Sequence, residues 1–213
     1  LSSMPYDLII CMPGTGDNEG FDVARTIKGQ YEHIPMVILT PFSHGITKRI
    51  ANEDLSSFDY IFCWLGNTDL LVSIIKLIED KMNLEHDVSE VGVQIILLVE
   101  DGIRFYSSIL PNLYKFVLKQ SQEFSTEALN AHQRTLRMRG RPKIVLARTY
   151  DEAIGIYEKY KNNILGVITD VRFPRVERGE KDALAGIKLC AAIRKEDPFV
   201  PLIIQSSESE NVL

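Results

Sequence analysis

The chain has 213 residues, 45% of them apolar and 25% charged, which is typical of a globular protein with one large domain or two small ones. Its formal net charge of -5 argues against a general nucleic-acid binder. No apolar run approaches the roughly 20 residues that span a bilayer, and no signal peptide is visible. Three cysteines lie far apart in apolar segments, which favours buried thiols in a reducing cytosol: Cys11, Cys63 and Cys190. We therefore expect a cytoplasmic protein that contacts neither a membrane nor nucleic acid.

In the first part of the chain, short apolar runs alternate with helical patterns. Strands are predicted over residues 7–12, 36–40 and 60–63, and helices over 21–28 and 43–52. A longer amphipathic helix begins at a cap formed by Asn67 or Thr68. Its predicted inner face carries apolar residues at helical spacing: Leu71, Ile74, Ile75, Ile78 and Met82. Residues 83–92 are polar and acidic without periodicity, so they are predicted to form a linker.

The second part of the chain opens with five apolar residues, 95–99, that lead directly into Glu100 and Asp101. Such a run is typical of a strand buried on both faces of a parallel sheet. Further strands are predicted over 144–147, 165–170 and 202–205, and helices over 103–119, 151–160 and 182–195. Another helix is expected to begin near Ser125 and to end before Gly140 and Pro142. This alternation predicts an α/β fold with a doubly wound parallel sheet and right-handed crossovers.

One pattern of residues occurs twice in the same register. Gly20 is followed at offsets of 4, 7, 15 and 20 residues by two helix positions, a proline and a hydroxyl, namely Ala24, Ile27, Pro35 and Thr40. Gly186 is followed at the same offsets by Cys190, Ile193, Pro201 and Ser206. The repeat predicts two copies of one domain, each incomplete in this sequence.

Three acids are predicted to meet at one edge of the second sheet. Glu100 and Asp101 end one strand and Asp170 ends another, and ligands bind at the carboxyl ends of strands in open α/β sheets. Three adjacent carboxylates resist ionising together unless a cation joins them. Oxygen ligands of this kind suit Mg²⁺, which leaves room for phosphate oxygens. Ser206 brings a hydroxyl to the same edge, so the set is suited to phosphoryl transfer.

These residues resemble the response-regulator receiver domains of two-component signalling. The segment 97–101 is similar to the acidic pair after the family's first strand, 170–174 to its phosphoacceptor aspartate with a proline four residues later, and 201–206 to its fourth strand. The resemblance implies a flavodoxin-like (CheY-like) strand order, 2-1-3-4-5, the order that is general for that fold. It implies Asp170 as phosphoacceptor, Ser206 as the switch hydroxyl and Mg²⁺ as cofactor. The metal ligands would be Asp101, Glu100 through water, Asp170, and the backbone carbonyl of Arg172.

The resemblance also implies partners and a location. The phosphodonor would be a histidine kinase, a phosphotransfer protein or a small phosphodonor in the bacterial cytoplasm. The chain itself would be a phosphoacceptor regulatory domain and not an enzyme.

Each copy departs from the family pattern. In the second copy, residues 175–182 are an insertion, residues 120–142 enlarge a crossover, and the sequence ends before the fifth strand with its lysine and aromatic switch residue. In the first copy, Met12 stands at the acceptor position, Cys63 at the lysine position and Trp64 at the following proline. We therefore predict the C-terminal part of a pseudo-receiver over 1–82, a linker over 83–92, and a receiver without its last strand and helices over 93–213.

Other functions remain open at this stage. Both copies could be phosphorylation-independent interaction modules. Alternatively, the chain could be the regulatory N-terminal segment of a larger enzyme, because the run 113–146, the turn 64–67 and the linker resemble the receiver tandem that precedes some bacterial phosphoenolpyruvate-synthase-like proteins.

Three further patterns have competing interpretations. The glycine-rich segment 13–20 lacks the spacing of a dinucleotide-binding loop, and a plain turn is favoured over a nucleotide site. A basic cluster favours a solvated face over a docking site for an acidic partner: Arg134, Arg137, Arg139, Arg141 and Lys143. Trp64, Leu65 and the helix 70–82 form either core or a homodimer or interdomain face, and core is favoured.

Overall fold

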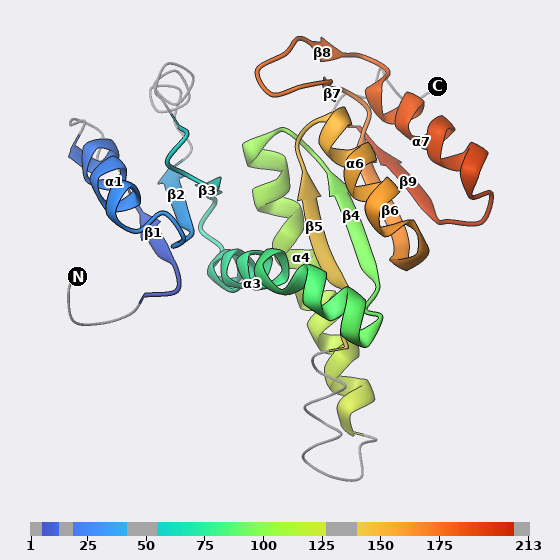
Figure 1. Cartoon of the computed structure of the whole chain (residues 1–213), viewed down its shortest axis with the longest axis horizontal. Coiled ribbons are helices and arrows are strands. Elements are labelled where there is room, and N and C mark those ends of the chain that lie inside the picture. The colour runs from blue at the N-terminus through green and yellow to red at the C-terminus, as the bar shows by residue number, and fades with distance from the viewer. Residues whose placement is uncertain (1–5, 13–18, 42–54, 127–139, 207–213) are drawn as a thin grey trace. The chain divides into compact units, whose positions relative to one another are not determined.

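The computed structural model describes residues 6–12, 19–41, 55–126 and 140–206 of the chain. Figure 1 shows their helices and strands in chain order. The chain divides into two compact units: residues 1–75 with 103–111, and residues 76–102 with 112–213. Helices α3 (Asp69–Val91) and α4 (Ile103–Thr126) therefore contribute to both units.

The first unit is built on a three-stranded parallel sheet in the order β1-β2-β3. Its strands are β1 (Ile9–Cys11), β2 (Met36–Pro41) and β3 (Tyr60–Trp64), and α1 (Glu19–Gln30) connects the first two. The beginning of α4 packs against this sheet. Tyr106 donates its hydroxyl to the carbonyl of Ile61, and the Ser107 hydroxyl accepts the backbone N–H of Cys63 at 2.9 Å. These buried contacts satisfy backbone polar groups along β3.

The second unit is built on a four-stranded parallel sheet in the order β5-β4-β6-β9. Its strands are β4 (Ile95–Val99), β5 (Lys143–Ala147), β6 (Ile164–Asp170) and β9 (Leu202–Gln205). The remaining elements are α6 (Tyr150–Tyr160), the 3-10 turn η1 (Lys161–Asn163), α7 (Ala185–Glu196) and a small antiparallel hairpin of β7 (Phe173–Pro174) and β8 (Lys181–Asp182).

One face of the four-stranded sheet is covered by α6 and α7. Tyr157 of α6 and Leu189 and Ile193 of α7 pack with Leu97 and Val167 of the strands in one fully buried cluster. Side chains on both faces of β4 are buried, which explains why its sequence is an unbroken apolar run. The predicted α/β class with parallel sheets is therefore confirmed.

The helices and strands begin at equivalent positions in the two copies of the sequence repeat. Helices α1 and α7 each have 12 residues and begin one residue before Gly20 and Gly186. Strands β2 and β9 begin directly after Pro35 and Pro201. Both helix-strand pairs thus keep the same spacing.

The predicted linker over 83–92 is wrong in its local structure, because α3 continues through Val91. Gly92 ends the helix with a φ of 70°, and its N–H donates to the carbonyl of Val88 at 3.0 Å, as in a left-handed glycine cap. The polar residues before this cap are held by partners that lie far away in the sequence. Asp87, for example, pairs with Lys143 at 2.7 Å.

The predicted inner face of α3 is also wrong in part. Ile74 and Ile78 are buried, but Leu71, Ile75 and Met82 are exposed. The buried positions at helical spacing are Leu70, Ser73, Ile74, Leu77, Ile78, Asp80 and Leu84. Two of them are polar, so a count of apolar residues alone rotates the predicted face.

Several sequence-based predictions lie outside the described residues. These are the helix over 43–52, most of the helix expected between Ser125 and Gly140, and the glycine-rich segment 13–18. Of the cysteines, Cys63 and Cys190 are buried and Cys11 is half-buried, and all three are free thiols as predicted.

Candidate metal centre

The three predicted acids meet at one edge of the four-stranded sheet. Strands β4 and β6 are parallel neighbours, with Val99 beside Thr169, so the residues that follow emerge side by side. One carboxylate oxygen from each of Glu100, Asp101 and Asp170 lies within 4.8 Å of the others. Among the described residues this is the only group of three or more such side chains that could share one ion.

Glu100 is the most buried member, with 3% of its surface exposed. Its Oε1 accepts the backbone N–H of Gly102 at 2.9 Å. The pKa of Glu100 is raised to about 7, mainly by burial and also by the charges of Asp170 and Asp101, against the opposing effects of the Gly102 N–H and Lys181. A cation at this edge would favour the ionised form.

Asp170 ends β6 in a similar environment. Burial raises the pKa of its carboxyl, and the charge of Asp101 adds to this effect. The backbone N–H groups of Val171 and Arg172 act in the opposite direction, and that of Arg172 donates to Oδ2 at 3.3 Å. The Arg172 N–H therefore helps to orient the carboxylate at the sheet edge.

Asp101 has one satisfied oxygen and one unsatisfied oxygen. Lys181 of β8 pairs with Oδ2 at 2.6 Å, whereas Oδ1 is buried with no hydrogen-bond partner among the described residues. A buried carboxylate oxygen without a partner is costly unless a donor or a cation completes it. Together with the all-carboxylate donor set, this orphaned oxygen fits a hard cation such as Mg²⁺.

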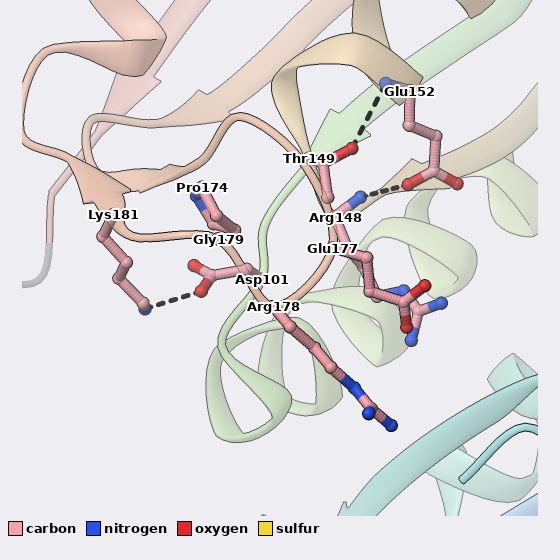
Figure 2. A pocket seen from close by; sticks show the side chains of 9 residues that line it. All are labelled: Asp101, Arg148, Thr149, Glu152, Pro174, Glu177, Arg178, Gly179 and Lys181. Carbon is pink, nitrogen blue, oxygen red and sulfur yellow. Dashed lines mark hydrogen bonds and ion pairs between the residues drawn. The ribbon is translucent and has the colours of Figure 1, made fainter.

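Sequence reasoning identified the insertion at 175–182 but not Lys181 as a site residue. The insertion folds back as the hairpin β7–β8, in which Lys181 lies opposite Pro174. Figure 2 shows its side chain facing Asp101 at one side of a pocket of about 440 Å³. Only a hairpin that returns to the strand end brings this lysine to the acids, and no sequence spacing signals it.

Two further predicted residues lie at the same edge. Ser206 directly follows β9, whose Gln205 lies beside Asp170 in the sheet register, and the Gln205 carbonyl accepts the N–H of Val171 at 3.2 Å. The Arg172 backbone carbonyl as a metal ligand stays a prediction. The switch role of Ser206 likewise stays a prediction.

Gly186 explains how α7 approaches this edge so closely. A Cβ at this position would lie 2.0 Å from the carbonyl oxygen of Asp170, and the Gly186 N–H donates to the carbonyl of Val171 at 3.0 Å. The repeated glycine therefore has a steric reason in the second unit: it lets the helix contact the backbone of the candidate phosphoacceptor.

The corresponding edge of the first sheet has different chemistry. Met12 directly follows β1 and is exposed, Thr40 is buried near the end of β2 with its hydroxyl on the carbonyl of Pro41, and Cys63 is buried in β3. Burial raises the pKa of the Cys63 thiol. A thioether and a buried neutral thiol are poor ligands for a hard cation.

The solvated-face interpretation of the basic cluster is wrong for two of its five residues. Arg141 and Lys143 are buried and surround Asp80, whose side chain is fully buried. The reason is charge pairing, since a buried carboxylate requires cations and donors around it. Arg134, Arg137 and Arg139 lie outside the described residues.

Comparison of the chain with family models, curated proteins and solved structures found no significant match. Among the helices of the described residues, none has both the length and the apolar character needed to cross a membrane.

Proposed function

We propose that this chain is a two-component signal-transduction receiver that accepts a phosphoryl group on Asp170 with Mg²⁺ and is preceded by a pseudo-receiver. The observation that carries the proposal is the convergence of Glu100, Asp101 and Asp170 within 4.8 Å at the ends of adjacent strands. The order β5-β4-β6-β9 supports it, because it corresponds to strands 2-1-3-4 of a flavodoxin-like sheet. The order β1-β2-β3 of the first sheet corresponds in the same way to strands 3-4-5 of an earlier copy.

In this proposal Asp170 is the nucleophile. One of its carboxylate oxygens attacks the phosphorus of a phosphohistidine or of a small phosphodonor, the bond from phosphorus to the donor nitrogen or oxygen breaks, and an acyl phosphate forms on Asp170. The N–H of Arg172, at 3.3 Å from Oδ2, orients the carboxylate for this attack.

Charge neutralisation falls to the cation that the acids would hold. Asp101 and Asp170 would bind Mg²⁺ directly and Glu100 through water, and the ion would offset the negative charge of the phosphoryl oxygens. The Ser206 hydroxyl, at the same sheet edge, would donate to the new phosphoryl group and couple it to the segment that follows.

The first unit would act without phosphate. Met12 follows β1 where a receiver has its acceptor, and a thioether does not form an acyl phosphate. This unit would instead bind a partner or a neighbouring domain.

Treatment of the full-length protein with acetyl phosphate or beryllofluoride and Mg²⁺ tests the proposal. We expect an adduct by intact mass or ¹⁹F NMR in the wild-type protein and none in Asp170→Asn. The matched control is Asp151→Asn, which removes a nearby acid whose ion pair with Arg175 is exposed. Absence of an adduct in the wild-type protein would contradict the proposal and favour a phosphorylation-independent interaction module. Any sequence beyond Leu213 would show whether the chain regulates a larger phosphoenolpyruvate-synthase-like enzyme.

A further inference from the structure

The sheet edge that carries Glu100, Asp101 and Asp170, called the acidic edge below, already has a positively charged side chain of its own. Among the described residues, Lys181 is the one basic side chain in ion-pair contact with the three carboxylates, through Asp101 Oδ2 at 2.6 Å. Lys181 keeps 46% of its side chain exposed, whereas Asp101 keeps 15%. The ammonium group thus reaches from the surface into a mostly buried carboxylate.

The backbone on both sides of Lys181 is anchored. Phe173, the first residue of the paired strand β7, is fully buried in the core cluster of the second unit. Asp182, the next residue, accepts the N–H of Leu184 at 3.0 Å and the Lys188 ammonium at 2.5 Å. The hairpin therefore holds the Lys181 backbone in place, and its flexible side chain is the part that can move.

The pocket beside the ion pair gives that side chain room. Asp101 and Lys181 line the pocket of about 440 Å³ together with two further carboxylates, Glu152 and Glu177 (Figure 2). The lining also includes Arg148 and Arg178, so an ammonium that leaves Asp101 can extend into the pocket and stay hydrated beside charges of both signs. Its withdrawal therefore does not require the hairpin to unfold.

We propose that Lys181 is a tethered competitor for the divalent cation: its ammonium group neutralises Asp101 when the metal is absent, and a divalent cation binds the acidic cluster by displacing it. This inference rests on the metal site of the proposed function and describes how the affinity of that site for divalent ions is regulated. An ammonium at 2.6 Å and a divalent ion would both draw on the charge of the Asp101 carboxylate, and they repel each other at this range.

Competition has a direct consequence for affinity. The free energy of breaking the ion pair is subtracted from the free energy of metal binding, so the wild-type site binds divalent ions more weakly than its carboxylates alone would. Removing the ammonium should strengthen binding, whereas a lysine that merely supported the metal site would weaken binding on removal.

The test is metal titration of the full-length protein and three variants, with Mn²⁺ binding followed by electron paramagnetic resonance and Mg²⁺ by competition. We expect Lys181→Met to bind Mn²⁺ about tenfold more tightly, which corresponds to about 1.4 kcal/mol. Lys181→Arg retains the positive charge and should bind as the wild-type protein does. Lys161→Met is the matched control, because it removes a positive charge and an exposed ion pair from the same unit without contact to the cluster or to the hairpin.

The outcomes separate this inference from the proposed function. Equal or weaker binding by Lys181→Met, or an equal gain in Lys161→Met, would overturn the competition. No saturable binding by any of the proteins would overturn both the competition and the metal site. Tighter binding by Lys181→Met in a protein that forms no adduct with acetyl phosphate would support the competition and contradict phosphoryl transfer.

Discussion

Two clusters of charged side chains lie at opposite ends of the four-stranded sheet, and they differ in balance. At the amino end of β5, the carboxylates of Asp80 and Asp87 are matched by the cations of Arg141 and Lys143. At the carboxyl ends of β4 and β6, three carboxylates face Lys181 alone among the described residues. In the first cluster positive charges match the negative ones, whereas in the second the negative charges outnumber the positive one.

Asp80 shows what a complete cluster looks like. Its fully buried carboxylate accepts two hydrogen bonds from Arg141, at 2.5 and 3.0 Å, one from the Tyr114 hydroxyl at 2.9 Å and one from the Ile144 N–H at 3.0 Å. Burial alone would lower the pKa of the Arg141 guanidinium, but the hydrogen bond to Asp80 raises it above its ordinary value. Both carboxylate oxygens have partners within the chain, so this cluster serves to join α3 to β5.

A structural charge cluster can be distinguished from a binding site by whether its charged groups all find partners within the chain. Both clusters contain buried carboxylates, and both lie in the second unit. The structural cluster satisfies each group internally, whereas the acidic edge leaves Asp101 Oδ1 without a partner and raises the pKa values of Glu100 and Asp170. Unmet charge and perturbed pKa values mark functional-site candidates.

The largest expected effect comes from breaking the complete cluster. Asp80→Asn should lower the free energy of unfolding by about 3–5 kcal/mol, because it leaves buried cations without compensation. Glu85→Gln is the matched control on the same helix: its ion pair with Lys159 is exposed on both sides, so its loss should change the free energy of unfolding little. Urea denaturation measures both. Equal losses in the two variants would contradict the assignment of Asp80 as the centre of the cluster.

The next largest effect concerns the pH dependence of stability that arises from Glu100 at the acidic edge. The pKa of Glu100 is about 7 in the folded chain and 4.5 ordinarily, so the folded state keeps this proton to higher pH than the unfolded state. Stability from Glu100 is therefore present at low pH and is lost as the pH rises from about 4.5 to about 7, by about 3 kcal/mol in all.

Urea denaturation in EDTA at a series of pH values measures this contribution. Subtracting the curve of Glu100→Gln isolates the one titrating group. Parallel pH curves for the wild-type protein and Glu100→Gln would show that burial does not perturb this carboxyl. Saturating Mg²⁺ should reduce the loss, because the ion favours the ionised carboxylate.

The smallest of the three effects concerns the backbone that carries the acids. Gly186→Ala should destabilise the protein by about 1–3 kcal/mol, because the added Cβ meets the Asp170 carbonyl and α7 has to shift. Gly155→Ala is the matched control in α6, where an added Cβ meets nothing within 4 Å and should stabilise the helix by about 0.5–1 kcal/mol. Thermal unfolding measures both. Similar changes in the two variants would contradict the close approach of α7.

The elements and the acids were largely determined by local sequence. The apolar run of β4 and the strand that ends in Asp170 were predicted from the local pattern of apolar residues, because a strand buried on both faces has to be apolar along its whole length. Parallel pairing then brings the strand ends together, so Glu100, Asp101 and Asp170 could be predicted to meet. Ser206 was placed at the same edge for the same reason.

Which charges pair depends on contacts between distant parts of the chain. Asp80 and Arg141 are separated by 61 residues, and a polar residue on a helix looks solvated until the distant cation that buries it is known. The same limit concealed the helical state of residues 83–91 and the return of Lys181 to Asp101. Burial of a charge depends on its partner and not on its neighbours in sequence, so these features were fixed by long-range pairing alone.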